Sequence, residues 1–574
     1  MVKKLLKALA VDRAIYVLFV GSLVWTLVMV RSGTNHDGGV GFWGANGHDG
    51  VWHIALTEAL ARGSLEMPVF AGEEVRNYHI GFDMIMALVH RVSGIPVSVL
   101  YFQIIPPIIA LSVGFVVLKL MKRLDYSESQ RIWGIFFVYF GGSWGWAVTL
   151  VREGRAGGES MFWGQQAIST LINPPFALSI VVLLAGLILL DGVIKRGKLQ
   201  DMYLSVIVFG LLIQIKAYAG VLALGGLGVC GLLRYLREKK KDLLGIFAGS
   251  ALVSVLVFIP LNREAGGMLV FKPFWFLETM MQLTDRVGWV RYGEAMVNYR
   301  SGGAWLKAVA AYTIAFVVFW YGNMGMRFLG EFELARWLRG IRNIFYIRAM
   351  ILVFVFGGVA LPMLVVQSGT AWNTIQFFYY SIFFMAVAAG AGVGRVWDKI
   401  RGERARVVLA GGIIVLTVPA SSATLKQVYL TKVPPSYLAK EEAEALAFLA
   451  EQPRGAVLTY PFDQAAAKEA EATAPRPLYL YTSTAYVSAY GKKPVFLEDE
   501  INLDITGFDW RKRKEEVLVF YESLDQNEVR GFLRENEIAY IYWVKTQRAR
   551  LGETQLGIER IYENSKVDIY KVIR

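Results

Sequence analysis

Long apolar runs dominate this 574-residue sequence and decide what it can fold into. Each of eleven runs is near the roughly 20 residues that a helix needs to cross about 30 Å of hydrocarbon. The runs are 14–30, 97–118, 132–150, 174–191, 202–216, 217–234, 242–260, 304–322, 349–367, 374–394 and 406–424. Only 19% of the residues are charged, against about a quarter in an ordinary soluble protein. We therefore predict a polytopic α-helical membrane protein with about 11 transmembrane helices and exclude a soluble globule.

The position of the basic residues predicts how the chain is oriented. A net charge of +13 would suggest nucleic acid as the partner of a soluble protein. Here Lys3, Lys4, Lys7 and Arg13 precede the first span, and further basic groups fall in every second connection. These connections are 119–123, 195–198, 237–241, 327–348 and 395–406. Because basic loops stay in the cytoplasm, the N-terminus is predicted to be cytoplasmic, membrane lipids surround the chain, and no nucleic acid is expected.

Basic groups fall in every second connection only if the apolar stretch 79–93 does not cross the membrane. It is shorter than a span and is interrupted by Asp83 and His90, so we expect a re-entrant or juxtamembrane helix on the outer side. The first span lacks an A-x-A cleavage site and is expected to act as a signal anchor. The odd number of spans then places the C-terminal part outside the cell. The longer outer segments are 31–96, 151–173 and 261–303.

From residue 425 onward the chain has the patterns of a soluble domain. This part carries 21 Lys and Arg against 23 Asp and Glu, whereas residues 1–424 carry 39 against 24. Helices are expected at 440–452, 511–524 and 527–536, and strands at 455–461, 493–500, 539–544, 558–564 and 566–573, the last two as a hairpin. We predict a transmembrane domain over 1–424, with a large first outer loop at 31–96, and an outer α/β domain with a partly parallel sheet over 425–574.

Two common kinds of site are not expected. A single cysteine rules out a disulfide framework, and no Cys/His spacing fits structural zinc. The glycines Gly390, Gly392 and Gly394 lie in a predicted span, where small residues let helices pack closely. We therefore interpret this pattern as helix packing and not as nucleotide binding.

All five histidines of the chain lie in the first outer loop, between residues 36 and 90. Histidine changes its protonation near neutral pH, and neighbouring carboxylates act as general bases or cation ligands. Asp49 and His53 are four residues apart, as are His79 and Asp83, so that each pair would share one helix face. This clustering predicts an active-site loop in which His53, His79 and Asp83 bind substrate.

Glycine-rich turns surround the two other acidic residues of the loop, Asp37 and Asp49. Such turns let the backbone place these carboxylates without side-chain obstruction. The structural alternative is a polar loop whose histidines and aspartates only cap helices, with Asp49 as the N-cap of a helix over 50–62.

The order of these elements resembles the GT-C class of membrane glycosyltransferases, which includes protein mannosyltransferases and aminoarabinose lipid A transferases. In this chain, as in the GT-C class, a first span leads to an outer loop in which an acidic residue opens a juxtamembrane helix. The acidic residue here lies within HDGVWH (48–53). The resemblance implies a polyprenyl-phosphate sugar donor, a glycan, lipid or protein acceptor, and a catalytic loop carboxylate. That role falls on Asp49, with Asp37 as the nearest alternative.

The resemblance also implies a divalent cation, Mg or Mn, bound by the loop carboxylate. Asp49 would then be a ligand, and Glu159 or Glu153 would supply the second acidic position of the class. The usual DxD or DE pair is absent, since Gly50 follows Asp49. Metal dependence therefore stays open, and an ordinary solvated charge is the alternative for both glutamates.

Polar residues within the spans are candidates for binding the lipid phosphate. Lys216 interrupts two apolar runs near the predicted outer border, where a lysine is costly and points to function, although snorkelling to the interface is the alternative. Asn373 and Gln376 begin a later span and need polar partners in lipid. A sugar or phosphate contact is one interpretation of these amides, and an interfacial belt is the other.

We therefore predict a multi-pass glycosyltransferase of a prokaryotic cell membrane, a hexosyl- or pentosyltransferase, that acts on the outer face. A transporter or lipid flippase is the alternative from another class. Transporters place charges within spans and often show inverted repeats, but acidic residues are scarce in these spans and no repeat is visible. A third hypothesis, an outer sensory or assembly domain with a membrane anchor, does not need eleven spans.

Overall fold

The computed structural model describes residues 12–340, 344–547 and 557–573. The chain forms two compact units. The first comprises the described residues up to 28 together with 107–260 and 267–429, and the second comprises 29–106, 261–266 and the described residues from 430 onward. Lys3, Lys4 and Lys7, which contribute to the predicted orientation, lie outside the described residues.

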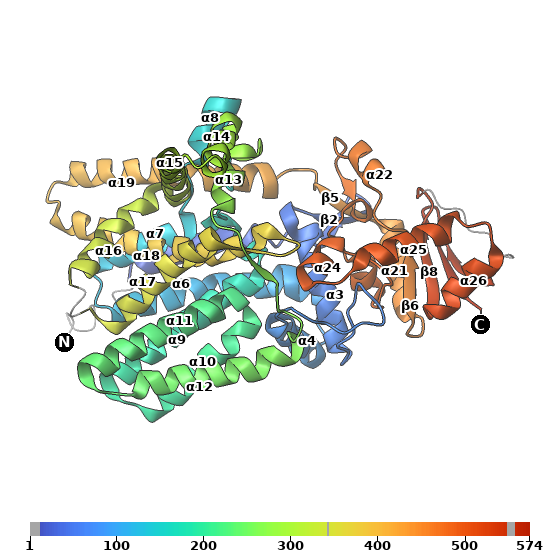
Figure 1. Cartoon of the computed structure of the whole chain (residues 1–574), viewed down its shortest axis with the longest axis horizontal. Coiled ribbons are helices and arrows are strands. Elements are labelled where there is room, and N and C mark those ends of the chain that lie inside the picture. The colour runs from blue at the N-terminus through green and yellow to red at the C-terminus, as the bar shows by residue number, and fades with distance from the viewer. Residues whose placement is uncertain (1–11, 341–343, 548–556, 574) are drawn as a thin grey trace, which may run out of the picture. The chain divides into compact units, whose positions relative to one another are not determined.

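The first unit is built almost entirely from helices (Figure 1). They are α2 (Ala14–Thr26), α6 (Ile105–Arg123), α7 (Glu128–Phe140), α8 (Gly145–Glu153), α9 (Pro174–Arg196), α10 (Leu199–Ile215), α11 (Ala217–Glu238), α12 (Asp242–Phe258), α13 (Trp275–Gln282), α14 (Val290–Ser301), α15 (Trp305–Met324), α16 (Gly330–Arg339), α17 (Tyr346–Leu364), α18 (Gln376–Lys399), α19 (Glu403–Thr417) and α20 (Pro419–Thr424). Two short strands, β3 (Leu269–Phe271) and β4 (Val365–Gln367), pair antiparallel.

Seven helices among the described residues are long and apolar enough to cross a membrane, or nine if each of two bent pairs forms one span. The bent pairs are α7 with α8 and α19 with α20, each bent by 46°. Two further apolar helices, α2 and α10, fall in predicted spans but are shorter. The polytopic helical architecture is thus confirmed, whereas the number of eleven spans is not.

Glycines explain how the central helix α18 packs against α7. A Cβ atom on Gly390 would lie 2.1 Å from the backbone nitrogen of Gly134, and one on Gly394 would lie 2.3 Å from Cα of Gln130. Real Cβ atoms do not approach this closely, so the two helices contact one another through their backbones. The interpretation of these glycines as packing residues is confirmed.

Ion pairs join the predicted cytoplasmic connections to one another. Lys195 donates to the backbone oxygen of Arg123 at 3.0 Å, and Arg123 and Lys195 pair with Asp191, at the end of the predicted span 174–191, at 3.2 Å and 3.0 Å. Arg395 lies 3.0 Å from Glu333. Connections that the positive-inside rule assigns to one side of the membrane therefore lie together in pairs.

The second unit combines the first outer loop with the C-terminal part of the chain. Its helices are α3 (Asp49–Ala61), α4 (Gly81–Ser93), α5 (Val97–Val99), α21 (Lys440–Glu451), α22 (Gln464–Glu469), α23 (Tyr486–Gly491), α24 (Glu500–Thr506), α25 (Trp510–Glu522) and α26 (Gln526–Glu535). Its strands are β1 (Thr34–His36), β2 (Gly39–Phe42), β5 (Ser436–Ala439), β6 (Ala456–Thr459), β7 (Arg476–Pro477), β8 (Ile538–Val544), β9 (Ile558–Glu563) and β10 (Val567–Val572).

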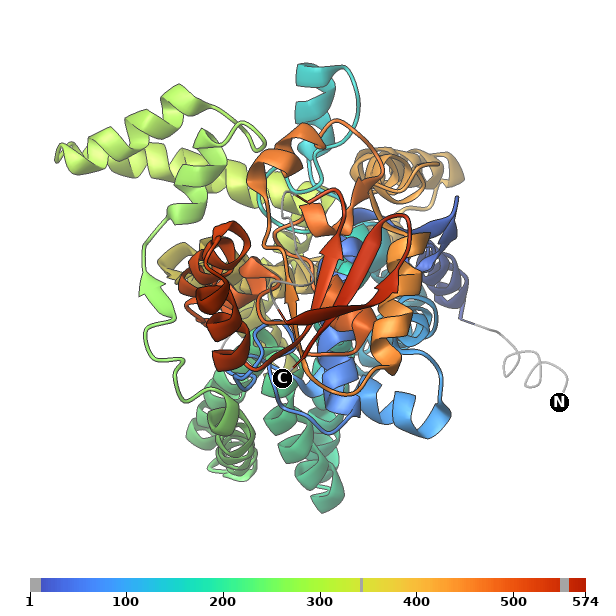
Figure 2. The same cartoon turned by 90° about the vertical axis from the view of Figure 1, so that its right-hand side faces the viewer.

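Two four-stranded sheets organise this unit. The first has the order β1-β2-β5-β7, so that the first outer loop and the C-terminal part share one sheet. The second has the order β6-β8-β10-β9, in which β6 and β8 are parallel and the others antiparallel. Figure 2 shows these strands near its centre with the dark red helices α25 and α26 beside them. The predicted α/β character and partly parallel sheet are confirmed.

One predicted strand of the C-terminal part is wrong. Within 493–500, only Val495 forms an isolated bridge to Val457. Pro494 has no N–H to donate to a ladder, and the chain enters α24 at Glu500. The segment is therefore a loop, and it brings its acidic residues to the start of a helix.

Candidate active site

Asp49 opens α3 and stands beside a histidine. The structural alternative, in which Asp49 is the N-cap of this helix, is wrong, because His48 occupies the cap position and Asp49 is the first helical residue. Its side chain is 53% exposed, and His48 Nδ1 lies 3.1 Å from Asp49 Oδ1. The positive end of the helix dipole stabilises an ionised carboxylate at this position.

A second carboxyl group, that of Asp499, belongs to the same electrostatic cluster. Asp499 is buried just before α24, and it accepts hydrogen bonds from the backbone N–H and the side-chain amide of Asn502, at 3.1 Å and 2.8 Å. Burial raises the pKa of the Asp499 carboxyl to about 7, and the charge of Asp49 adds to this rise, while Asn502 and His48 oppose it.

His48 links the two carboxyl groups. Burial alone would lower the pKa of its imidazole, but the hydrogen bond to Asp49 and the charges of Asp49 and Asp499 outweigh this effect, so the pKa is raised. The ring of Tyr481 stacks on it, with ring centroids 5.9 Å apart. The site therefore combines one accessible carboxylate, one imidazole with a raised pKa, and one buried carboxyl group.

His53 and Asp83 form a buried pair behind this site. His53 Nδ1 lies 2.8 Å from Asp83 Oδ1, both side chains are almost fully buried, and the hydroxyl of Thr57 donates to the same oxygen at 3.3 Å. The ring of Tyr101 stacks on His53, with centroids 5.7 Å apart. His79 is buried but lies outside α4, which begins at Gly81, so it does not share a helix face with Asp83.

The helix α4 itself matches the predicted helix that does not cross the membrane. It is 13 residues long and is not among the candidate spans of the described residues. Met84, Ile85, Leu88 and Val92 are exposed along one face, while Asp83 lies on the buried side. Such an apolar face suits a helix that lies at a membrane surface.

The other candidate base, Asp37, lies in a different place. It occupies the turn between β1 and β2, its side chain is 92% exposed, and His36 Nε2 lies 3.4 Å from it. Within the described parts of the chain, no ion pair or hydrogen bond joins Asp37 to Asp49. By contrast, His53 and His79 both contact the ring of Tyr78, with centroids 6.5 Å and 4.6 Å apart.

In the first unit, Lys216 separates α10 from α11 with an extended backbone and is 4% exposed. Its ammonium nitrogen lies 3.4 Å from the side-chain oxygen of Asn173, and 5.7 Å from the ring centroid of Tyr218. Asn173 also caps α9 by accepting from the backbone N–H of Phe176. The lysine is therefore held at the junction of three helices.

The two amides predicted from the sequence belong to the same polar network. The Asn373 side-chain amide donates to Gln367 Oε1 at 2.8 Å, and the Gln376 amide donates to the side-chain oxygen of Asn373. The hydroxyl of Tyr218 reaches Gln367 Oε1 at 3.5 Å. Tyr218 and Gln367 thus connect Lys216 with Asn373 and Gln376, although Lys216 lies more than 150 residues before these two amides in the sequence.

The side chains described do not assemble a metal site. Asp49 and Glu159 lie in different units, and Glu159 accepts from the backbone N–H of Gln166 and the hydroxyl of Ser169, at 3.1 Å and 2.9 Å. Among the described residues, no group of three or more His, Cys, Asp and Glu side chains is placed to hold a metal ion.

Asp499 was not singled out from the sequence. The only local signal is the acidic run Glu498–Glu500 after the apolar residues 495–497 in an otherwise soluble domain. Nothing in the spacing relates it to Asp49, which lies 450 residues earlier. The pairing of β2 with β5 explains why Asp49 and Asp499 belong to one site, because it joins the first outer loop to the C-terminal part.

Comparison with known proteins identifies the fold. Neither family models nor curated protein sequences match this chain. Among solved structures, the archaeal oligosaccharyltransferase AglB from Archaeoglobus fulgidus, in complex with an inhibitory peptide and a dolichol-phosphate, is similar with a TM-score of 0.52 and 9% identity, over 92% of this chain and 69% of that chain. The chain has the GT-C fold.

Two further solved structures support this assignment of the fold. The Archaeoglobus fulgidus enzyme in complex with Zn and sulfate has a TM-score of 0.51 and 11% identity, over 92% of this chain and 68% of that chain. The arabinofuranosyltransferase AftD from Mycobacteria has a TM-score of 0.52 and 13% identity, over 98% of this chain and 41% of AftD. The present chain thus spans less than half the length of AftD.

Proposed function

We propose that this protein is a membrane glycosyltransferase that moves a sugar from a polyprenyl-phosphate donor to a hydroxyl group of the acceptor, with Asp49 as general base. The observation that carries this proposal is the accessible carboxylate of Asp49 at the start of α3, held by His48 and coupled to Asp499. The GT-C fold, which is found in an oligosaccharyltransferase and an arabinofuranosyltransferase, favours a transferase over a transporter.

In the proposed reaction, Asp49 takes the proton of the acceptor hydroxyl. The hydroxyl oxygen then bonds to the anomeric carbon of the sugar while the bond from that carbon to the phosphate oxygen breaks. The lipid phosphate leaves with the bonding electron pair. His48 donates a hydrogen bond that orients the Asp49 carboxylate, and Asp499, with a pKa of about 7, avoids a full second negative charge beside it near neutral pH.

Lys216 is the proposed partner of the lipid phosphate. An ammonium group in a site that excludes water stabilises the negative charge that develops on the leaving phosphate. The amide groups of Asn373 and Gln376 supply further hydrogen-bonding groups in the same network. Lys216 belongs to the first unit and Asp49 to the second, so the role of each residue is proposed and tested by itself.

The direct test is sugar transfer by the purified full-length protein with a panel of polyprenyl-phosphate hexoses and pentoses and with glycan, lipid and peptide acceptors. We expect Asp49→Asn to lower kcat by about 10²- to 10⁴-fold, the usual contribution of a general base. The matched control Asp37→Asn should keep the wild-type kcat. Unchanged turnover in Asp49→Asn would remove the assignment, whereas substrate uptake by proteoliposomes without transfer would favour the transporter.

Dependence on Mg²⁺ or Mn²⁺, with Asp49 and Glu159 as ligands, stays a prediction. Turnover with and without EDTA, followed by addition of either ion, measures it directly. A loss that Mg²⁺ or Mn²⁺ restores would establish the dependence, and Glu159→Gln would then show whether this glutamate takes part.

The second unit is proposed to lie outside the cell, with the N-terminus in the cytoplasm. Cys230, the only cysteine, is buried and can be replaced by serine. In that background, Asp37→Cys should react with a membrane-impermeant maleimide in intact cells, whereas Lys240→Cys, in the basic connection 237–241, should react only after permeabilisation. The reverse pattern would overturn the orientation.

A further inference from the structure

We propose that a basic pocket at the C-terminal end of α3 binds an oxyanion, a carboxylate or phosphate carried by an anionic sugar chain. The pocket has a volume of about 230 Å³ and lies within the second unit. Arg62, Arg454, Lys492 and Lys493 line it, whereas Glu66 is its one acidic lining residue. Because α3 has 13 residues, this pocket lies roughly 20 Å from Asp49 along the helix.

Lys493 is the buried cation of this pocket. It is 4% exposed, and its ammonium group donates to the backbone oxygen of Gln452 at 2.6 Å. Lysine has three N–H donors, so this bond uses one of them. No Asp or Glu in the described part of the chain forms an ion pair with Lys493, and burial, assisted by the charge of Arg62, lowers its pKa to about 8. An anion in the pocket would supply the missing counter-charge.

The other three cations are held at the rim. Arg62 and Lys492 lie 3.4 Å and 3.3 Å from the two carboxylate oxygens of Glu58, and Arg454 lies 2.6 Å from Glu66. Four cations thus face two carboxylates, which leaves a net charge of about +2 at the pocket. Because these ion pairs already restrict the rim side chains, a ligand would meet donors that are partly ordered in advance.

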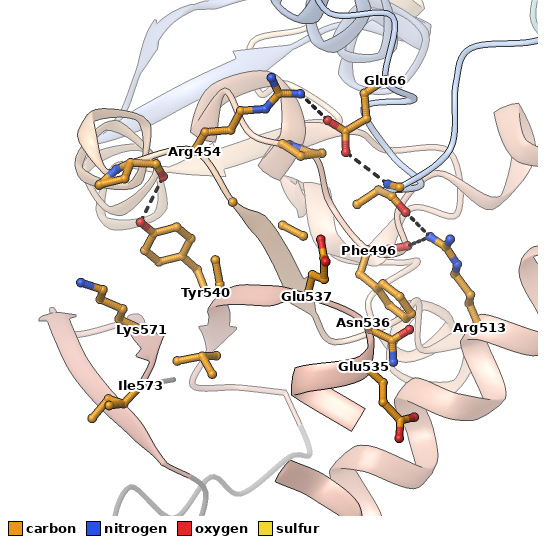
Figure 3. A pocket seen from close by; sticks show the side chains of 18 of the residues that line it. Glu66, Arg454, Phe496, Arg513, Glu535, Asn536, Glu537, Tyr540, Lys571 and Ile573 are labelled. Carbon is orange, nitrogen blue, oxygen red and sulfur yellow. Dashed lines mark hydrogen bonds and ion pairs between the residues drawn. The ribbon is translucent and has the colours of Figure 1, made fainter. Parts of the chain in front are cut away.

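A larger cavity adjoins the basic pocket, and its lining indicates which kind of molecule bears the acidic group. It has a volume of about 940 Å³ and shares Glu66, Arg454 and Pro494 with the basic pocket. Figure 3 shows Arg454 bonded to Glu66 at its edge, and Tyr540 farther along its wall. Asn536 and Glu537 also line the cavity, and Lys493 lies 5.8 Å from the ring centroid of Tyr540.

This lining favours a sugar chain over a free ion. Amide and carboxylate groups hydrogen-bond to hydroxyls, and an aromatic ring supplies an apolar contact surface. The space far exceeds what one phosphate ion needs. We therefore infer that the cavity holds hydroxyl-rich sugar residues while the basic pocket holds the acidic group.

Calorimetric titration of the full-length protein tests the proposal with three probes: a uronic-acid oligosaccharide, the matching neutral oligosaccharide, and inorganic phosphate. We expect the uronate to bind saturably, at least tenfold more tightly than the neutral oligosaccharide and more tightly than phosphate alone. The double variant Arg62→Ala/Lys492→Ala should raise the Kd of the uronate about tenfold or more, since a charge-assisted hydrogen bond contributes about 1.5–3 kcal/mol. Its melting curve would show that it folds.

The matched control is Lys440→Ala, at the opposite end of α21 from Gln452, where the exposed lysine pairs only loosely with Glu444. Its Kd should stay within twofold of the wild-type value. Equal binding of uronate and neutral chain, or a Kd that the double variant leaves unchanged, would overturn the proposal. If phosphate binds as tightly as the uronate oligosaccharide, the inference that the cavity holds a sugar chain is overturned. If phosphate binding is lost only in Lys216→Met, the oxyanion site lies elsewhere and the proposal is overturned. Sugar transfer is not the readout, so the result is independent of the proposed function.

Discussion

His53 Nδ1 and Asp83 Oδ1 lie 2.8 Å apart, and this buried hydrogen bond joins α3 to α4 together with the weaker bond from the Thr57 hydroxyl to the same oxygen. The first turn of α3 carries Asp49, and α4 presents the apolar face of the first outer loop. The bond therefore fixes the helix that carries the proposed base relative to the helix beside it. We expect both residues to act as positioning residues and not to contact the sugar.

Replacing Asp83 should show whether this residue positions the site or binds the substrate. Asp83→Ala leaves the buried ring nitrogen of His53 and the hydroxyl of Thr57 without their hydrogen-bond partner, and each unsatisfied buried polar group costs about 1–3 kcal/mol. We expect a lower Tm and, well below that Tm, a reduced kcat with little change in the KM of the donor. Asp83→Asn, which keeps the shape and one hydrogen bond, should recover part of the kcat. A wild-type Tm and kcat in Asp83→Ala would contradict this role.

This pair also shows how far the sequence predicts the site. The sequence predicts helices at 50–62 and 79–93, and the four-residue spacing of His79 and Asp83 predicts that they share one helix face. The structure begins α4 two residues after His79, and Asp83 turns to His53 on the neighbouring helix. A local pattern defines which residues share a face of one helix, but the partner across the interface depends on packing that no short segment encodes. The same limit explains why Asp499 was missed.

Close packing between α7 and α18 predicts the effect of a small substitution. Gly390→Ala would place a Cβ atom 2.1 Å from the backbone nitrogen of Gly134, so the helices would have to separate. We expect a smaller monodisperse fraction in size-exclusion chromatography and a clearly lower Tm.

The control for this prediction is Gly411→Ala on α19, where an added Cβ meets no atom within 4 Å. Alanine favours a helix over glycine by up to about 1 kcal/mol. The Tm of this variant should therefore be unchanged or raised. Equal behaviour of Gly390→Ala and Gly411→Ala would refute the account of the α7–α18 contact.

Replacing Lys216 should weaken binding of the donor without lowering the stability of the protein. Lys216→Met keeps the length of the side chain but removes a buried charge, so the Tm should be maintained or raised. The KM for the polyprenyl-phosphate donor should rise about tenfold, in line with the roughly 1.5–3 kcal/mol of a hydrogen bond to a charged group. The exposed Lys307 provides the matched control Lys307→Met. An unchanged donor KM would exclude Lys216 as the phosphate partner.

The buried carboxyl group of Glu442, at the start of α21, predicts a pH dependence of stability. Burial raises its pKa to about 7 from an ordinary value of 4.5, against the opposing effects of the bond from the Ala439 backbone and the charge of Lys566. As the pH rises from 4.5 to 7, the unfolded chain loses this proton while the folded chain retains it. The free energy of unfolding therefore falls through this window, by at most about 1.4 kcal/mol per pH unit, and levels off above it.

Glu442→Gln removes this titration while it keeps the size of the side chain. Other buried acids, including Asp499, titrate in the same direction, so the informative quantity is the Tm of Glu442→Gln minus that of the wild type at each pH. This difference should rise between about pH 5 and 7 and then stay constant, because only the wild type continues to lose stability in that range. A difference that does not vary with pH would show that Glu442 ionises equally in the folded and unfolded chains.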